Sequence, residues 1–298
     1  MTNYAGYMGK VIRLDLSSRS VSEYPWTDRD RQLYLGGKAM ASKIMYDNFT
    51  GSEKPLEPEN IIVISTGPLT GTGAPSSSRF NISTLSPQTG ITTSSNCGGN
   101  FGHYLKKAGY DALIIAGKCE KLTWVEIHND IIKFHDAEEL KGLCTTPTQE
   151  SIQQKLDEER GCEVKCGKVV IGPAGENLVK YASVFSNERA AGRAGVGCVF
   201  GSKNLKGIAV SGTHEVSIYD LQKTHELFEK WVETLKKHPL TGNQLPKMGT
   251  AGLVTTMQMR GLLPTRNYAK GQFEDFELVN GETFAEDINI VNKGCLSC

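Results

Sequence analysis

The hydrophobic and polar positions of this chain follow a strand-like pattern up to about Thr213 and a helix-like pattern beyond it. Short apolar or alternating runs predict strands, and two pairs of them are joined by turn residues as β-hairpins. These runs lie at residues 10–24, 61–66, 111–118, 123–136, 168–172 and 181–186. The runs at 61–66 and 111–118 are almost wholly apolar, which is typical of buried central strands.

Apolar residues at helical spacing predict helices between and after these strands. The expected helices lie at residues 28–46, 101–109, 145–161, 217–239 and 250–261. Asp28 and Asp30 suit the start of the first helix, because carboxylates stabilise a helix N-terminus. The pair Gly36-Gly37 within it either loosens the helix or lets another backbone approach closely.

Together these elements predict an α+β fold with two domains. A β-rich domain is expected over residues 1–212, and the beginning of a helical domain over residues 213–298. In the first domain, the solvated helix after Cys144 is expected to be capped by Thr145 or Thr146 and ended by Gly161. Its short helices are expected to lie between strands.

Residues 67–102 form a polar stretch with an unusual density of Gly, Ser, Thr and Asn and with one arginine. Side chains alternate over residues 79–85, with Arg79 and Asn81 on one face and Phe80 on the other. This alternation predicts a strand between two polar loops. Backbone amides freed by glycines, beside one cation, suit an anionic ligand of some size.

A second glycine-rich stretch covers residues 187–212. Its spacing, G-x-G-x-x-x-G, misses the dinucleotide-binding fingerprint by one position, and it also lacks the G-K-[ST] of a phosphate loop. Two interpretations stay open. Either Arg189 and Arg193 cradle phosphates together with backbone amides, or they pair with surface carboxylates and the glycines only permit tight turns.

Charge and composition narrow the class of protein. The chain of 298 residues carries 33 basic and 33 acidic side chains, so its net charge is zero and no basic excess favours nucleic acid or a membrane surface. The N-terminus lacks the apolar core of a signal peptide, and no apolar run approaches a membrane span. A cytoplasmic protein without a membrane span is therefore expected.

Eight cysteines are scattered along the chain, and only two pairs have a spacing that suits a metal. Cys295 and Cys298 form a C-x-x-C pair, which supplies half of the ligands of an iron–sulfur cluster. Cys162 and Cys166 lie in a helix-to-strand loop, where a structural role is the simpler interpretation. The six histidines form no recognisable triad, and Glu176 could be either a site carboxylate or a backbone cap.

Several long motifs occur in one order across nearly the whole chain. They are GPLTGTGAP, SSRFNIS, SPQTG, NCGGNFG, AGYDALIIAGK, IGPAGENLVKYAS, RAAGRAGVGCVFGSKNLKGIAV and NKGCLSC. In these motifs the chain resembles the N-terminal part of the aldehyde:ferredoxin oxidoreductase family of tungsten enzymes. The resemblance implies a first domain of two β-sheets that forms a base for a tungsten (or molybdenum) bis-molybdopterin cofactor.

The resemblance also implies roles for individual residues. Arg79 matches the arginine that bridges a pterin and the cluster, and Asn96 and Gly98 match the first pterin-binding loop. The second phosphate loop matches Arg189, Ala190, Gly192 and Arg193. The backbones of Asn96 and Ala190 are implied to hold a Mg²⁺ between the two pterin phosphates. Cys295 and Cys298 match the first two ligands of a [4Fe-4S] cluster.

The implied reaction is oxidation of a small aldehyde to its acid, with electrons passing through the cluster to ferredoxin or a ferredoxin-like subunit. A homo-oligomer is compatible with this. Relatives continue for several hundred residues with further cysteines and the acid/base residues, so this chain is expected to be the cofactor-binding N-terminal part, and no catalytic residue is assigned. The alternatives are the tungsten subunit of a benzoyl-CoA reductase, or a stand-alone, non-catalytic pterin-binding fragment.

Overall fold

A computed structural model of the protein describes residues 4–287, 294 and 296. The chain divides into two compact units, with the division between Tyr219 and Asp220. Within the described residues, the strands form two six-stranded sheets, and both belong to the first unit. The expected α+β fold is confirmed.

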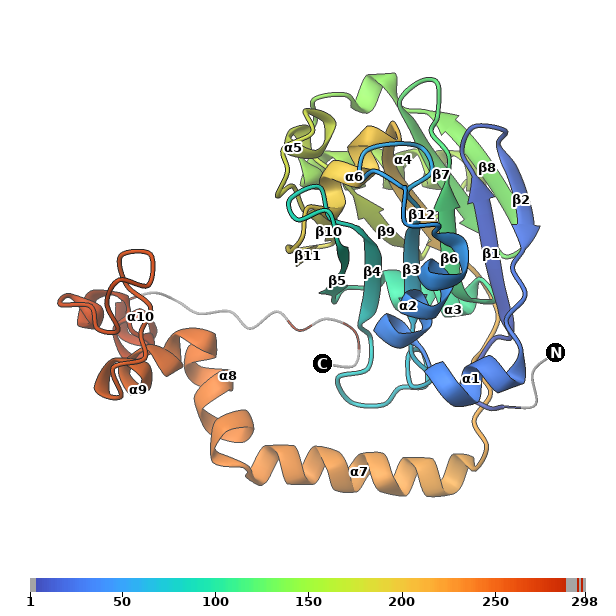
Figure 1. Cartoon of the computed structure of the whole chain (residues 1–298). Coiled ribbons are helices and arrows are strands. Elements are labelled where there is room, and N and C mark those ends of the chain that lie inside the picture. The colour runs from blue at the N-terminus through green and yellow to red at the C-terminus, as the bar shows by residue number, and fades with distance from the viewer. Residues whose placement is uncertain (1–3, 288–293, 295, 297–298) are drawn as a thin grey trace. The chain divides into compact units, whose positions relative to one another are not determined.

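The first sheet has the strand order β2-β1-β6-β3-β4-β5 (Figure 1). Its strands are β1 (Lys10–Asp15), β2 (Ser20–Glu23), β3 (Ile62–Thr66), β4 (Phe80–Leu85), β5 (Thr92–Cys97) and β6 (Tyr110–Ala116). Strands β1 and β6 are parallel, and the other neighbours are antiparallel. Strands β3 and β6 are buried along their whole length, as their apolar sequences predict.

The second sheet has the order β11-β10-β9-β12-β7-β8. Its strands are β7 (Thr123–His128), β8 (Ile131–Asp136), β9 (Gly167–Val170), β10 (Val184–Ser186), β11 (Arg189–Ala191) and β12 (Leu205–Ser211). Strands β7 and β12 are parallel, and the other neighbours are antiparallel. The two sheets share one apolar core, to which both contribute buried Val, Ile and Leu side chains.

Helices of the first unit fill the core between the sheets and cover their outer faces. They are α1 (Asp28–Tyr34), α2 (Gly37–Asn48), α3 (Phe101–Lys107), η1 (Glu138–Leu140), α4 (Thr145–Arg160), α5 (Pro173–Glu176) and α6 (Val196–Ser202). Helices α3 and α6 contribute Phe101, Leu105 and Phe200 to the shared core. Helix α2 packs on β3 and β4, and α4 packs on β9 with its own apolar cluster.

Three details of the predicted elements are corrected. Residues 92–97 are expected as a loop but form strand β5, which pairs with β4. Their side chains are mostly polar, so no apolar alternation along the sequence indicates this strand. The helix expected at 28–46 is broken at Leu35 and Gly36, where a Cβ on Gly36 would lie 2.5 Å from the Thr66 carbonyl oxygen. Helix α4 begins after Cys144 without a side-chain cap, since neither threonine next to it caps the helix.

The second unit is helical, as expected. Its elements are α7 (Leu221–Lys237), the π-helical turn η2 (Leu240–Gln244), α8 (Leu245–Met248), η3 (Gly249–Leu253), α9 (Val254–Met259), η4 (Phe276–Val279) and α10 (Gly281–Asp287). Asp220 caps α7 by accepting a hydrogen bond from the Lys223 amide. The apolar stripe of α7, including Leu227 and Trp231, is exposed. None of the described helices is long and apolar enough to cross a membrane.

Candidate cofactor-binding site

The polar end of strands β4 and β5 carries the residues expected in the first loop. The two strands are antiparallel with Phe80 opposite Cys97 and Asn81 opposite Asn96. Continued by one residue, this register places Arg79 opposite Gly98. Arg79 and Asn96 are exposed and Gly98 is buried. The fold therefore gathers these residues at one edge of the first sheet.

A buried amide holds the Asn96 side chain. Asn81 donates through Nδ2 to Asn96 Oδ1 at 3.1 Å and to Ser94 Oγ at 2.5 Å, and its Oδ1 accepts a hydrogen bond from Ser83 Oγ at 2.6 Å. Asn81 is 2% exposed, so its amide is buried with its donors and acceptor satisfied. This network confirms that Asn81 and Ser83 share a face, and it fixes the rotamer of Asn96.

The second glycine-rich stretch lies beside the first. Strand β11, which contains Arg189 and Ala190, contacts β5, which contains Asn96. The Arg193 amide donates to Ser95 Oγ at 3.2 Å, and the Asn100 amide donates to Asn187 Oδ1 at 3.2 Å. Two segments about ninety residues apart in the sequence are thus joined side by side at the edges of the two sheets.

This edge has a positive character. Residues 92–100 and 186–194 contain Glu188 as their one acidic residue. Arg79, Arg189 and Arg193 are exposed there. The guanidinium groups of Arg79 and Arg193 form no hydrogen bond or ion pair with the residues that the structure describes, so both can bind an anion. Within the described residues, Arg193 therefore does not follow the alternative in which the arginines pair with surface carboxylates.

The glycines of the second stretch serve two different purposes. A Cβ on Gly197 would lie 2.4 Å from the Ser183 carbonyl oxygen, and a Cβ on Gly201 would lie 1.9 Å from that of Gly175. Those two glycines let α6 pack closely on neighbouring backbone. A Cβ on the exposed Gly192 would meet no atom nearer than 3.8 Å. Packing within the described chain does not require glycine there, whereas a ligand lying against the backbone would.

Comparison with known proteins identifies the family. The model of the aldehyde ferredoxin oxidoreductase N-terminal domain matches residues 11–212, and the model of domains 2 and 3 of the same enzymes matches residues 226–298. The chain belongs to the aldehyde ferredoxin oxidoreductase family. The predicted resemblance is therefore confirmed.

Curated members of the aldehyde ferredoxin oxidoreductase family match nearly the whole chain. The tungsten-containing aldehyde ferredoxin oxidoreductases of Thermococcus kodakarensis and Pyrococcus furiosus are each 40% identical over 294 residues, which is 98% of this chain and 48% of the relative. The chain thus spans about half the length of these relatives. Among solved structures, the active-site complex BamBC of benzoyl coenzyme A reductase with 1,5-dienoyl-CoA matches at 29% identity and a TM-score of 0.82, over 99% of this chain and 46% of that one.

The predicted cluster ligands of the aldehyde ferredoxin oxidoreductase pattern, Cys295 and Cys298, lie outside the described residues. In the other cysteine pair, Cys162 is exposed, and the Cys166 thiol donates to Gln153 Oε1 at 3.3 Å.

The carboxylate of Glu176 contacts other residues of the first unit. It pairs with the buried Lys206 and accepts a hydrogen bond from the Gly142 amide at 2.8 Å. The structure thus favours a structural role for Glu176.

One cluster of possible metal ligands among the described residues is formed by Glu126 of β7, His135 of β8 and Glu159 of α4. Cations of the protein already neutralise it. Arg160 Nη2 lies 2.9 Å from Glu126, and Lys133 Nζ lies 3.1 Å from Glu159 and 3.7 Å from Glu126. Hydrogen bonds from His135 and Arg160 lower the pKa of Glu126 to about 2 against the opposing effect of burial. The arrangement stabilises the fold without needing a metal.

Sequence reasoning missed the residues that hold the site in place. Asn81 and Ser95 contact Asn96 and Arg193 from neighbouring strands. The signal for Asn81 in the sequence was the alternation over residues 79–85, which placed its side chain on the same face as that of Arg79. No pattern along the chain could reveal Ser95, because its partner is 98 residues away.

Proposed function

We propose that this chain is the cofactor-binding part of a tungsten (or molybdenum) oxidoreductase that converts a small aldehyde to its carboxylic acid. The observation that carries the proposal is the contact between β5 and β11, which joins two polar segments with exposed arginines. A cofactor with two phosphate-bearing pterins needs two such segments. The relatives, tungsten-containing aldehyde ferredoxin oxidoreductases, suggest the metal and the reaction.

The residues present fit a bis-molybdopterin cofactor with a Mg²⁺ ion. The guanidinium groups of Arg79 and Arg193 form no hydrogen bond or ion pair with the described residues. The backbone at Gly192 is open to close approach by the cofactor. Asn96 and Ala190 are exposed on the neighbouring strands β5 and β11. Their carbonyl oxygens are hard ligands of the kind that Mg²⁺ prefers, so they are our candidates for the ion between the two phosphates.

When bound, the metal–pterin group would supply the two-electron chemistry of aldehyde oxidation. The chain's own part is to bind and orient that group. Arg79 and Arg193 neutralise negative charge, and Asn81 keeps Asn96 in one rotamer. We assign the acid/base step to none of residues 92–100 or 186–194.

Electron transfer is the second part of the proposal. Cys295 and Cys298 would supply two thiolates of a [4Fe-4S] cluster, and further cysteines must come from elsewhere. Ferredoxin or a ferredoxin-like subunit would accept the electrons. The cytoplasm is the proposed compartment, and a homo-oligomer is compatible with this function.

Metal and cofactor analysis of protein purified without oxygen tests the proposal. We expect tungsten or molybdenum by mass spectrometry and pterin by fluorescence after acid release. Aldehyde-dependent reduction of a viologen dye is expected of the whole oxidoreductase that contains this chain. An Arg79→Gln, Arg193→Gln double variant should retain much less pterin, and the exposed Arg29→Gln variant is the matched control. Protein with neither metal nor pterin would refute the proposal.

A benzoyl-CoA reductase-type reaction is the second candidate, because the match to the BamBC complex covers 99% of this chain. The two functions share the cofactor and differ in substrate. A viologen assay with simple aldehydes, run in parallel with reduced dye and benzoyl-CoA, separates them. Turnover of benzoyl-CoA without turnover of any aldehyde would decide for the second.

A further inference from the structure

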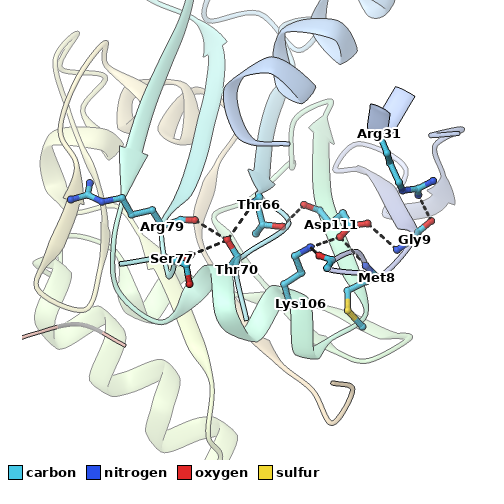
Figure 2. A network of polar contacts seen from close by, with 11 residues as sticks. Met8, Gly9, Arg31, Thr66, Thr70, Ser77, Arg79, Lys106 and Asp111 are labelled. Atoms are coloured by element: carbon cyan, nitrogen blue, oxygen red, sulfur yellow. Dashed lines mark hydrogen bonds and ion pairs between the residues drawn. The ribbon is translucent and has the colours of Figure 1, made fainter. Parts of the chain in front are cut away.

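The hydroxyl of the buried Thr70 contacts both ends of the loop that leads from β3 to Arg79 (Figure 2). Thr70 Oγ1 lies 3.1 Å from the carbonyl oxygen of Ser77 and 3.3 Å from that of Arg79. The amide of Gly67 donates to the same hydroxyl at 3.3 Å. The side chain of Thr70 therefore joins Gly67, the first residue of the loop, to the backbone of Ser77 and Arg79 at its end.

The two branches of Thr70 contact different parts of the protein. Thr70 is 2% exposed, and a Cβ built on Gly102 of α3 would lie 3.4 Å from the Thr70 methyl carbon. The methyl group thus faces α3 and the hydroxyl faces the loop carbonyls. Removal of the hydroxyl would take a hydrogen-bond donor away from these part-buried carbonyl groups.

The loop before Arg79 combines restrained and open positions. Ser77 Oγ donates to the Ala74 carbonyl oxygen at 2.7 Å, and Phe80, directly after Arg79, is 1% exposed at the start of β4. Gly73 has φ +85°, and a Cβ there would meet no atom within 4 Å. The guanidinium of Arg79 extends away from Thr70, and in the described part of the chain it has no partner (Figure 2). The direction of the Arg79 side chain therefore depends on its backbone. Thr70 is one contact that holds this backbone, through the Arg79 carbonyl group, and the buried neighbours Ser78 and Phe80 flank it.

We propose that Thr70 is a positioning residue for Arg79, which sets the guanidinium group for the phosphate-bearing pterin. This inference rests on the proposed function. Thr70 itself does not touch the cofactor; it acts through the backbone of Arg79. A misplacement of that backbone by a fraction of an ångström would weaken a charge-assisted, directional contact.

Two substitutions separate the two branches of the side chain. Thr70→Val keeps the shape and removes the hydroxyl, and Thr70→Ser keeps the hydroxyl and removes the methyl group. We expect the Val variant of the whole chain to retain about tenfold less pterin after gel filtration, and the Ser variant to stay within about twofold of the parent. Thermal unfolding of each variant is recorded alongside.

A double-mutant cycle shows whether Thr70 acts through Arg79. In an Arg79→Gln background, the Thr70→Val substitution should cause no further loss of pterin. Independent, multiplied losses would mean that Thr70 supports the fold alone, and would overturn the inference. Equal pterin retention by the parent and the Val variant would overturn it as well.

The Ser variant decides the matter if the Val variant does not fold. We expect Thr70→Ser to unfold at a lower temperature and to retain its pterin, because the methyl group packs against α3 and the hydroxyl positions Arg79. Loss of pterin in proportion to lost stability would overturn it. A parent protein that contains no pterin at all would instead refute the proposed function, so the two failures are distinguishable.

Discussion

Three buried basic side chains, Arg31, Lys106 and Lys206, each pair with a carboxylate, and the sequence alone does not show which charges are buried. Lys106 and Lys107 are adjacent on α3, yet only Lys106 is fully buried. Its ammonium group lies 2.5 Å from Asp111 Oδ1 and donates to the Gly6 carbonyl oxygen at 2.9 Å (Figure 2). Asp111 also accepts hydrogen bonds from the amides of Met8 and Gly9. The ion pair thus holds the N-terminal segment against the first sheet.

Lys106→Met should destabilise the first unit by about 3–5 kcal/mol, because it leaves a buried carboxylate without its cation. The matched control is Lys10→Met, which breaks the exposed ion pair with Asp130 and should cost about 0–1 kcal/mol. Urea unfolding followed by circular dichroism measures both. Equal costs for the two variants would contradict this role of Lys106.

Glu126 should make stability depend on pH below its ordinary pKa. The pKa of Glu126 is lowered from 4.5 to about 2 in the folded protein, chiefly by the hydrogen bond from His135. The charged carboxylate therefore stabilises the fold above pH 4.5, and this contribution is lost as the pH falls toward 2. In Glu126→Gln, the unfolding temperature should fall less steeply across that interval. Glu150→Gln, on an exposed face of α4, should keep the parental slope.

At the scale of elements, the sequence predicted most strands and helices but not strands β5, β11 and β12 or helix α6. Apolar periodicity identified β3, β4, β6 and the β7–β8 hairpin, because their side chains enter the core. Strand β5 consists of Thr, Ser, Asn and Cys and carries no such pattern. It is held by its ladder with β4 and by contact with β11, and pairing between distant segments leaves no local trace in the sequence.

The glycines around α6 allow a test that separates packing from binding. Gly201→Ala should destabilise the first unit by about 2 kcal/mol or more, since its Cβ would collide with backbone of α5. Gly192→Ala should leave the free energy of unfolding within about 0.5 kcal/mol, because space surrounds its Cβ. The second variant should still lose most of its bound pterin. Unchanged pterin retention in Gly192→Ala would argue against close approach of the cofactor there.

For the whole molecule, residues 67–102 alone predicted an anion-binding segment, but only the family motifs linked it to the second glycine-rich stretch in one site. Arg79, Asn96 and Arg189 each lie in a motif, but their proximity depends on the edge where the first sheet meets the second. Residue spacing alone left the second glycine-rich stretch open between binding and turn formation. The contact between β5 and β11 is a property of two separate sheets, and no periodicity within either segment encodes it.

The division after Tyr219 predicts that the first unit folds by itself. Each of its three apolar clusters draws all of its buried residues from between Val11 and Val210. A chain ending at residue 219 should therefore unfold cooperatively and keep its near-ultraviolet circular dichroism. It also lacks the exposed apolar residues of α7, such as Trp231, so it should bind less of the dye ANS than the whole chain does. Strong ANS binding together with loss of near-ultraviolet dichroism would show that the first unit needs residues beyond 219 to form its core.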